Sequence, residues 1–517
     1  MKLKEESIRW AINHLIKEKD TDLFPSPKEI YVFDKHKEAV IKRLKDLDIS
    51  QHKFSPSRRF VIPKEELSYR VATQLDPIDS LLLAAITYEF GSKIEHRRRR
   101  VSEDTVFSYR FNPLENGIFY SNESSWNDFW KACLQKSEIK KYVVQMDISD
   151  FYNQIYHHTM ENQLTESGLP NQVTKFIIRL LEHLTMTVSR GIPIGPHSSH
   201  LLAESTLIPI DDSLSVRGVD FCRYADDIFV FCNTEKEAKI AIYNMAGILD
   251  KQQRLILQKQ KTKILTTEDF IPYCEQMLND NPMNENEDKM IKVLKKYTAG
   301  LYQAFNYRRL NDDEIDCFSA ENIEELIEEY LEIDDPDFKK IRWFYRRLSQ
   351  LGIPTGIEFT IKNINRLMPA ISDICHYLIS ASEYFEDDFL VLGDNLMKIL
   401  EDPLINANEY FYIAIVNLFA SNSNLNHLTK LLELFQNSAP EIKRKIIFAA
   451  YEAKASSWIR ELKESYSGLD PWSRRALLIA CSILPEDEKE HYLKHIKKTH
   501  TLSVTEEILI EWALKKG

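Results

Sequence analysis

Glycine is scarce in this chain of 517 residues, which has 13 of them, about 2.5% where soluble proteins average about 7%. Such scarcity disfavours turn-dense all-β folds and glycine-rich phosphate-binding loops. The seven cysteines are odd in number and widely spaced, with no CxxC pair and no Cys/His cluster at zinc spacing. The sequence therefore predicts a helix-rich protein without a disulfide framework or a structural zinc.

Long apolar runs are missing too. No stretch approaches the ~18 to 20 apolar residues of a membrane span, and the first residues include acidic side chains where a signal peptide needs an apolar run. We therefore expect a cytoplasmic protein with no membrane partner. A nucleophile elbow, a Walker loop and a HExxH helix are also absent, which removes common hydrolase, P-loop and zinc-protease chemistries.

Charge is distributed unevenly along the chain. The totals are 67 Lys+Arg and 79 Asp+Glu, a net charge of −12. Residues 1–270 contain 38 of each sign, so the whole acidic excess lies in residues 271–517. The length suggests two to four domains, and the asymmetry predicts two regions with different electrostatic roles.

Carboxylates stand at the ends of predicted strands in the first region. Residues 142–148 form an apolar run that reaches Asp147, and residues 219–232 form two β-rich runs flanking Asp226 and Asp227. Like charges a few ångströms apart raise the pKa of one another unless cations offset them. Two Mg²⁺ ions about 3.5 to 4 Å apart would provide that offset and would suit phosphoryl transfer. A solvated Asp-rich turn is the simpler alternative for the pair alone.

Between these strands the sequence predicts a helix near residues 171–187, then a loop rich in glycine and proline, then another helix. Strand, helix, turn, helix and hairpin alternate as in an α+β sheet domain.

Four motifs, in order, resemble those of reverse transcriptases. They are Asp147-Ile148-Ser149-Asp150-Phe151-Tyr152, Gly191-Ile192-Pro193-Ile194-Gly195-Pro196, Tyr224-Ala225-Asp226-Asp227 and Leu255-Ile256-Leu257-Gln258-Lys259-Gln260-Lys261-Thr262. In that family a strand with a metal-binding Asp, a Gly/Pro loop with its helix, a Tyr-x-Asp-Asp hairpin and a lysine-bearing strand follow one another. The resemblance implies reverse-transcriptase-like fingers and palm over residues 1–275.

The resemblance also implies a metal centre. Asp147 and Asp226 would be metal ligands together with the Ile148 carbonyl, and Asp227 would be the supporting carboxylate. Mg²⁺ is the implied cofactor of this two-metal site, with Mn²⁺ as a possible substitute.

Substrate-binding residues follow from the same motifs. Tyr152 matches the aromatic residue that packs under the incoming sugar and favours dNTPs over rNTPs, although a core aromatic is the alternative. Lys261 matches a lysine near the departing pyrophosphate, and a solvated strand-end lysine is the alternative. Gly191 and Pro193 match the loop that lies beside the substrate.

Arginines upstream are candidates for the triphosphate, because guanidinium groups suit phosphate oxygens. Arg70 and Arg110 lie in segments that resemble fingers elements of the family, and each has a surface ion pair as its alternative. Residues 97–100 are four consecutive arginines, a density of positive charge typical of a patch that contacts phosphates. Acidic residues lie beside them in the sequence, so a surface loop whose charges are neutralised by ion pairs is almost as good an interpretation.

The chain departs from templated enzymes of the family. Arg190 stands where a Gln is usual, Gly195 where a Ser is usual and His200 where an Asn is usual. Those positions help to seat the template and the nascent base pair, so the departures argue against templated copying. After Lys261 no primer-grip hairpin or basic thumb is found, and the acidic segment 321–337 would repel a duplex backbone.

From about residue 285 the pattern is helical at a period of 3.6 residues. The predicted helices cover 288–305, 337–351, 408–419, 426–436, 441–453, 471–484, 490–498 and 504–514. Their lengths and short connections predict an all-α, HEAT-like domain over residues 285–517, with a compact bundle as the alternative.

A palm with this altered loop, no thumb and a helical second half resembles the bacterial abortive-infection (Abi) reverse transcriptases of phage defence. The resemblance implies untemplated addition of dNTPs, primed from a protein tyrosine hydroxyl. It also implies single-stranded DNA attached covalently to the protein, a helical half that fills the duplex groove, and homo-oligomers. Two alternatives remain. One is a templated enzyme of the retron or group II intron kind, and the other is a non-catalytic helical scaffold or sensor, which the presence of all three aspartates disfavours.

Overall fold

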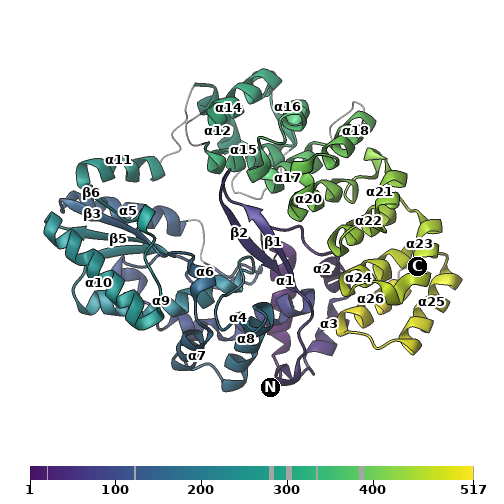
Figure 1. The fold of residues 1–517 in the computed structure, drawn as a ribbon, viewed down its shortest axis with the longest axis horizontal. Helices are drawn as coiled ribbons and strands as arrows, with labels where there is room; N and C mark the ends of the chain where they lie inside the picture. The colour runs from purple at the N-terminus through teal and green to yellow at the C-terminus, as the bar shows by residue number, and fades with distance from the viewer. Residues whose placement is uncertain are drawn as a thin grey trace. The chain divides into compact units, whose positions relative to one another are not determined.

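The computed structural model describes residues 1–19, 21, 23–120, 124–278, 285–297, 306–332, 336–382 and 389–515 (Figure 1). Contacts divide the chain into two compact units. The first contains Met1–Arg58 and Thr73–Asp280, and the second contains Arg59–Ala72 and Asn281–Gly517. The predicted domains 1–275 and 285–517 stay a prediction, and they differ from these units mainly in the segment Arg59–Ala72.

The first unit is built on a four-stranded antiparallel sheet with the order β4-β5-β3-β6. The strands are β3 (Tyr142–Asp147), β4 (Phe221–Tyr224), β5 (Asp227–Cys232) and β6 (Lys263–Thr266). Strand β3 pairs with β5 on one side and with β6 on the other. The strands predicted at 142–148 and 219–232 are confirmed.

Helices cover both faces of this sheet. Helix α10 (Glu235–Gln253) contacts β3, β5 and β6, whereas α5 (Ser124–Glu138) and α11 (Thr267–Leu278) contact the sheet and each other. Because side chains alternate along a strand, Val143 and Phe231 face α5 and α11 while Val144 faces the other way, and all three are buried. This double burial explains why the strands are continuous apolar runs.

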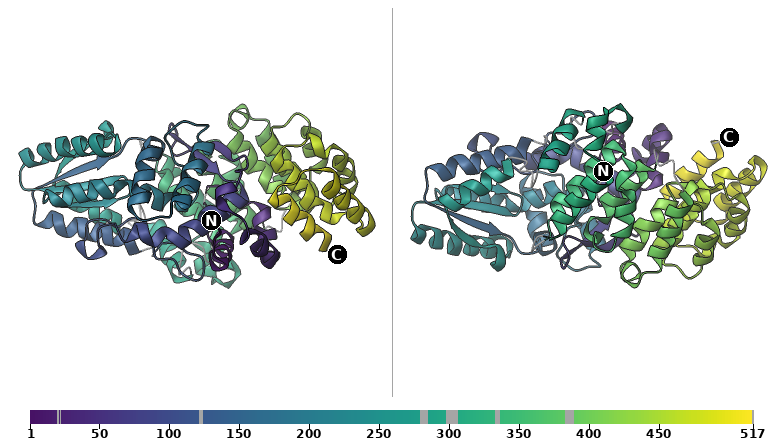
Figure 2. Two further views of the ribbon diagram at one scale, coloured as in Figure 1. Left: turned by 90° about the horizontal axis from the view of Figure 1, so that it is seen from below. Right: turned by 90° about the horizontal axis from the view of Figure 1, so that it is seen from above.

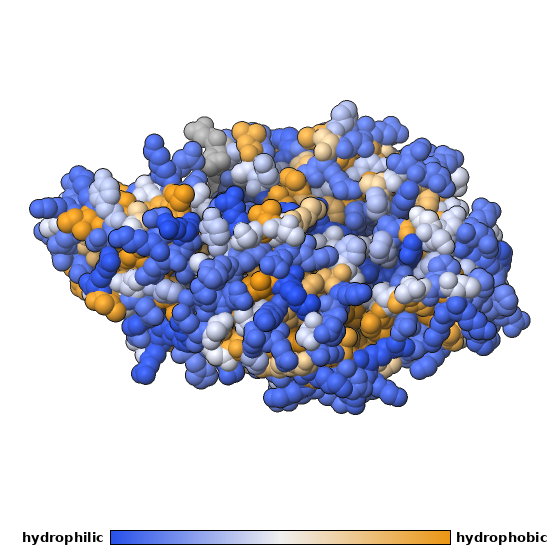
Figure 3. All heavy atoms as spheres, turned by 60° about the horizontal axis from the view of Figure 1, so that its bottom comes forward, coloured by the Kyte–Doolittle hydropathy of each residue, from blue (hydrophilic) through white to orange (hydrophobic). Residues whose placement is uncertain are grey.

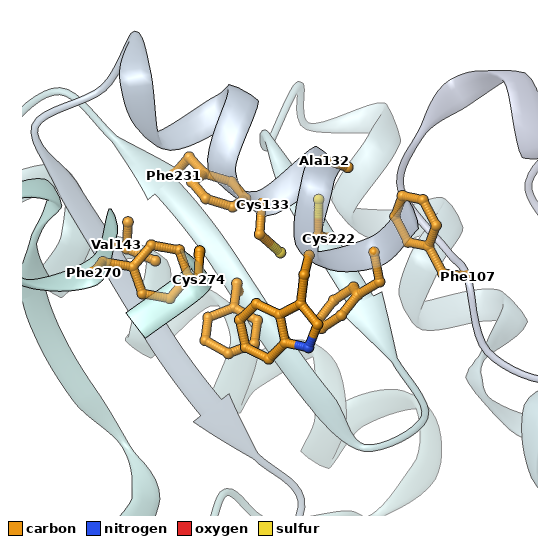
Figure 4. Close-up of a cluster of buried hydrophobic side chains, with 11 residues drawn as sticks. Phe107, Ala132, Cys133, Val143, Cys222, Phe231, Phe270 and Cys274 are labelled. Carbon is orange, nitrogen blue, oxygen red and sulfur yellow. The ribbon is translucent and has the colours of Figure 1, made fainter. Parts of the chain in front are cut away.

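A cluster of aromatic and thiol side chains fills the space between the sheet, α5 and α11 (Figure 4). Cys133 of α5, Cys222 of β4 and Cys274 of α11 lie among Phe231 and Phe270 there. Burial raises the pKa of the Cys274 thiol to about 12, so this cysteine is a neutral packing residue. The cysteines of this cluster are free, as the sequence predicts.

The first unit contains eight further α-helices among its described residues. They are α1 (Glu5–Lys17), α2 (Lys28–Lys35), α3 (Lys37–Leu44), α4 (Pro77–Glu95), α6 (Phe151–Gln154), α7 (His157–Glu166), α8 (Asn171–Leu184) and α9 (Ser198–Val216). Helix α8 confirms the helix predicted near 171–187. Helices α4 and α9 contact each other, and both are buried over most of their length.

The second unit joins a hairpin to a stack of helices. The hairpin strands are β1 (Arg58–Pro63) and β2 (Tyr69–Gln74). The helices are α12 (Glu285–Tyr297), α13 (Asp312–Asp316), α14 (Ala320–Glu332), α15 (Phe338–Leu351), α16 (Ile357–Lys362), α17 (Ile371–Ala381), α18 (Phe389–Leu400), α19 (Pro403–Asn406), α20 (Glu409–Phe419), α21 (Leu428–Leu434), α22 (Pro440–Glu452), α23 (Ser456–Leu462), α24 (Pro471–Ala480), α25 (Glu486–Thr499) and α26 (Val504–Lys515).

Helices α15, α17, α20, α22, α24 and α26 form a series in which each packs on the next (Figures 1 and 2). All the predicted helices of this half are present, although α12 ends at Tyr297 and residues 298–305 lie outside the described residues. The all-α character is confirmed, whereas the HEAT-like repeat stays a prediction. The sequence analysis predicted no helix at α13, α14, α16, α17, α18, α19 or α23. Helix α17 is buried around much of its circumference and has no clear polar face, whereas α14 lies in the segment that was interpreted only by its acidic charge.

The surface agrees with the ordinary composition of the chain. On the face drawn in Figure 3, hydrophilic residues predominate and apolar residues form separate groups. Within the described part of the chain, no helix has both the length and the apolar character needed to cross a bilayer.

Two glycines give a test of the helical packing. A Cβ added at Gly393 in α18 would lie 2.1 Å from the Leu425 carbonyl oxygen, whereas a Cβ at Gly247 in α10 meets nothing within 4 Å. We expect Gly393→Ala to lower the free energy of unfolding by about 2 to 3 kcal/mol. The matched change Gly247→Ala should raise it by about 0.5 to 1 kcal/mol. Urea unfolding measures both, and an unchanged midpoint for Gly393→Ala would contradict this packing.

Candidate active site

Three carboxylates meet where β3 ends and β5 begins. Asp147 is the last residue of β3 and lies directly opposite Asp227, the first residue of β5. Asp226 and Ala225 form the two-residue turn between β4 and β5, and Ala225 has a left-handed backbone with φ of +52°. The structure thus brings together the aspartates that the sequence singled out.

The three carboxylates repel one another. Burial raises the pKa of Asp226 to about 6, and repulsion from Asp227 and Asp147 adds to the shift. The Lys261 ammonium group bonds to Asp147 Oδ2, while about half of the lysine side chain stays exposed. The pKa of Asp226 stays raised although this lysine lowers it, so additional positive charge at the site would be favourable.

Lys261 reaches this position from a turn instead of a strand. The sequence predicts a strand carrying Lys261, but Lys259–Lys261 form a 3-10 turn that precedes β6. The extended residues before it pair with the end of β3 and the residue after it, since Gln258 N–H donates to the Asp147 carbonyl at 2.7 Å and Leu257 forms a bridge with Ile148. The turn then directs the Lys261 side chain back to the Asp147 carboxylate, which sequence pattern alone does not show.

The donor set fits a divalent cation. Among the described residues, no three His, Cys, Asp or Glu side chains form a ready-made metal cage. Mg²⁺ needs no such cage, because it commonly uses one or two carboxylates and completes its shell with water and substrate phosphates. Asp147 and Asp226 provide those carboxylates, and Ile148, whose carbonyl is a predicted ligand, follows directly after Asp147. When bound, such an ion stabilises the attacking and leaving oxygens of phosphoryl transfer.

Tyr152 is held in place by its neighbours. Its hydroxyl lies 2.7 Å from Nδ1 of His200, and the His200 ring stacks on Tyr109 with centroids 4.0 Å apart and an angle of 2°. Burial lowers the pKa of His200 to about 3 and raises that of Tyr152 well above its usual value. The Tyr152 hydroxyl is thus paired with an uncharged imidazole, and the role of Tyr152 at the sugar stays a prediction.

The glycine-proline loop acts through its backbone. Gly191 and Pro193 are buried, and His157 Nε2 lies 2.8 Å from the Gly191 carbonyl oxygen. Gly195 has φ of +137°, and an added Cβ would lie 2.7 Å from the Thr73 carbonyl oxygen, so only glycine fits. The predicted contact of Gly191 and Pro193 with substrate stays a prediction.

The predicted triphosphate arginines occupy different surroundings. Arg110 binds Glu95 at 2.6 Å and the Arg99 carbonyl at 3.0 Å, and burial lowers its pKa. Arg70 belongs to β2 in the second unit, and its buried Nε has no hydrogen-bond partner among the described residues. Their roles at the triphosphate stay predictions, with Arg110 already engaged by a carboxylate.

Carboxylates pair with three arginines of the run 97–100, of which only Arg98 is buried. Arg97 pairs with Glu166 at 2.8 Å, Arg98 with Glu204 at 2.7 Å, and Arg99 with Glu103. The structure therefore agrees with the compensated interpretation of this run.

Sequence reasoning missed the buried ion network below the carboxylates. Arg223, one residue before Tyr224, is fully buried and pairs with Glu204 at 2.9 Å and Asp211 at 2.6 Å. The available signal was Glu204 itself, since an acidic residue inside the apolar segment of α9 must be paired when buried.

Comparison with known families decides the chemistry. Residues 62–294 match the family model described as "Reverse transcriptase (RNA-dependent DNA polymerase)". The chain is a nucleotidyltransferase of the RNA-directed DNA polymerase kind. The matched range contains all four sequence motifs, and a polymerase of this kind acts on nucleotides and nucleic acid.

Other comparisons of this polymerase add little. One similar solved structure is the "Structure of telomerase from Candida albicans in complexe with TWJ fragment of telomeric RNA", with 12% identity over 79% of this chain and 71% of that chain. Its TM-score of 0.31 supports no further inference. A search of curated proteins finds no match.

The raised pKa of Asp226 predicts a cost in stability. A carboxyl whose pKa in the fold is about 6 destabilises the metal-free fold above pH 6, and this cost disappears below about pH 4. We expect Asp226→Asn to raise the free energy of unfolding at pH 8 by on the order of 2 kcal/mol and to change nothing at pH 4. Mg²⁺ should raise the Tm of the parent protein more than that of the variant. Equal stabilities at pH 8 in EDTA would contradict the electrostatic assignment.

Proposed function

We propose that this polymerase adds dNTPs without a template to a hydroxyl group of the protein itself, in homo-oligomers, and that it acts in anti-phage abortive-infection defence. The acidic character of the second half carries the proposal. A polymerase that grips a template–primer duplex neutralises phosphates with basic side chains. Residues 271–517 instead contain 29 Lys+Arg and 41 Asp+Glu.

Much of this acidic charge lies on helix α14. Its sequence AENIEELIEEYLE has six glutamates and no lysine or arginine. Glu328 pairs with Arg366 at 2.6 Å, but the helix as a whole carries a strong negative charge. Such a helix disfavours a duplex backbone nearby.

Basic and aromatic residues on α15 fit a single strand better than a duplex. Phe344 and Tyr345 are core residues with 1% and 0% exposure, so they are not available for stacking. Trp343 is only partly buried, and the Arg347 guanidinium lies 5.5 Å from its ring. Stacking of bases on such residues requires fewer phosphate contacts than a duplex does.

The departures in the loop motif support the same proposal. His200, which replaces the usual Asn, bonds to Tyr152 and stacks on Tyr109. Arg190, which replaces the usual Gln, donates to Gln154 at 3.2 Å. Both side chains thus have hydrogen-bond partners within the first unit, His200 in a buried setting and Arg190 at the surface.

The reaction joins a hydroxyl oxygen to the α-phosphorus of a dNTP and releases pyrophosphate. Asp147 and Asp226 would hold Mg²⁺, with the Ile148 carbonyl as a further ligand and Asp227 as the supporting carboxylate. Tyr152 would lie under the sugar. Lys261, Arg70 and Arg110 would contact phosphates, and Gly191 and Pro193 would line the substrate.

One prediction of this proposal concerns the choice between deoxyribose and ribose. If Tyr152 packs under the deoxyribose, Tyr152→Val should admit a 2′-hydroxyl and reduce the preference for dTTP over UTP by about 10- to 100-fold. The control Tyr152→Phe keeps the ring and loses only the hydrogen bond to His200, so it should change the preference roughly fivefold or less. Single-nucleotide incorporation kinetics give both ratios. An unchanged preference for dTTP over UTP in Tyr152→Val would show that Tyr152 is only a core aromatic residue.

A second prediction concerns the primer and the template. Purified protein given labelled dNTPs alone should form DNA that survives phenol extraction with the protein and is released by protease. An annealed primer on RNA or DNA should not direct its sequence. Asp226→Asn should form no product and controls for contaminating polymerases. Product that copies an added template would instead establish the templated alternative.

A further inference from the structure

The buried ion network in the first unit has a single central carboxylate. Glu204 in α9 is 2% exposed and accepts hydrogen bonds from Arg98 at 2.7 Å and from Arg223 at 2.9 and 3.1 Å. Burial alone would raise the pKa of Glu204, but the two guanidinium groups outweigh it and lower the pKa to about 2. A permanent negative charge therefore fixes both arginines.

Arg223 connects this charge to the aspartate turn. Its Nη1 donates to the Ala225 carbonyl oxygen at 2.9 Å, and Asp211 fixes the other edge of the guanidinium at 2.8 and 2.6 Å. Ala225 has a left-handed backbone, which L-residues keep only where their surroundings impose it. Because Asp226 follows directly, the peptide that Arg223 holds sets the direction of its carboxylate.

Arg98 makes the equivalent connection to the tyrosine side of the site. Its Nη1 donates to the Tyr109 carbonyl at 2.9 Å and its Nη2 to the Ser108 carbonyl at 2.7 Å. The Ser108 hydroxyl donates to Glu204 Oε1 at 2.6 Å. Tyr109 is also left-handed, with φ of +45°, and its ring stacks on His200.

The two connections have the same form. In each, an arginine bound to Glu204 donates to the carbonyl of a left-handed residue, Ala225 or Tyr109. Asp226 follows Ala225 in the sequence. The Tyr109 ring stacks on His200, which is hydrogen-bonded to the Tyr152 hydroxyl.

We propose that Glu204 is a positioning residue that sets the metal-binding turn and the sugar-contacting Tyr152 together, through Arg223 and Arg98. The inference rests on the proposed roles of Asp226 and Tyr152. Glu204 touches neither of them and acts through backbone carbonyls. Loss of Glu204 should therefore alter two properties at once, the Mg²⁺ requirement and the discrimination between sugars, whereas loss of either connection should alter one.

The experiment compares isosteric variants in the full chain. Glu204→Gln keeps the shape and removes the charge, and we expect the Mg²⁺ concentration for half-maximal incorporation to rise about 10- to 100-fold. The dTTP:UTP ratio of kcat/KM should fall roughly fivefold, the effect of one lost hydrogen bond. The rise in Tm on adding Mg²⁺, which requires no turnover, should also need more Mg²⁺ in the variant.

Matched variants separate the two connections. Asp211→Asn weakens only the hold on Arg223, so it should raise the Mg²⁺ requirement and leave the sugar ratio unchanged. Ser108→Ala removes one hydrogen bond on the Arg98 side, so it should lower the sugar ratio and leave the Mg²⁺ requirement unchanged.

A folded Glu204→Gln protein with a lower rate but the parental Mg²⁺ requirement and sugar ratio would overturn the proposal, because the network would then be purely structural. If Glu204→Gln does not fold, Asp211→Asn and Ser108→Ala test the proposal in its place. Parental values in both, or both properties shifting in each, would overturn the proposal. The Mg²⁺ requirement and the sugar ratio can be measured with any primer that the protein extends. If the enzyme proves to be templated, the proposed function is wrong, but these measurements still test the role of Glu204.

Discussion

Mutual repulsion among Asp147, Asp226 and Asp227 is the constraint on which the first unit depends. The antiparallel register of β3 and β5 places two of them opposite each other, and the turn adds the third. The fold opposes this repulsion with apolar packing on both faces of the sheet and with the Lys261 ammonium group. It does not remove the repulsion, since the pKa of Asp226 stays raised at about 6. A sheet end at which carboxylates repel one another is suited to bind cations, which matches the polymerase chemistry assigned by the family comparison.

The two units solve different electrostatic problems. Charges of residues 1–270 balance overall, and the buried ones form specific pairs such as Arg223 with Glu204 and Arg98 with Glu204. Residues 271–517 carry the acidic excess, but the helices of this range stack through apolar faces, and most of their charged side chains lie on the surface. Surface charge of this kind contributes little to stability. Its effect is on which polyanions approach, and this is why the acidic second half, more than any one motif, argues against a bound duplex.

Local pattern predicted the parts of this protein whose partners are near in sequence or are set by periodicity. The strands ending at Asp147 and starting at Asp227 were predicted from apolar runs, and the helices of the second half from their 3.6-residue period. Contacts between distant residues could not be predicted. The pairing of Arg110 with Glu95 is one of them, since the sequence offers many acidic partners. The assignment of the segment Arg59–Ala72 to the second unit is another, because the hairpin packs through Phe60 near Tyr410, 350 residues later in the chain. The buried α17 shows the limit of periodicity itself.

Buried ion pairs are a poor means of stabilising a core, and this bears on why the network around Glu204 exists. Replacing such a network by well-packed apolar side chains is often neutral or stabilising by about 1 to 4 kcal/mol, because desolvation of the charges cancels their attraction. Apolar side chains, however, cannot donate to a carbonyl group. Ala225 and Tyr109 both keep left-handed backbones, and the carbonyl of each is bound by an arginine of the network. The property that only the charged network supplies is therefore the orientation of two backbone segments, one beside Asp226 and the other beside the ring that stacks on His200. Geometry at the site, and not stability of the core, accounts for these buried charges.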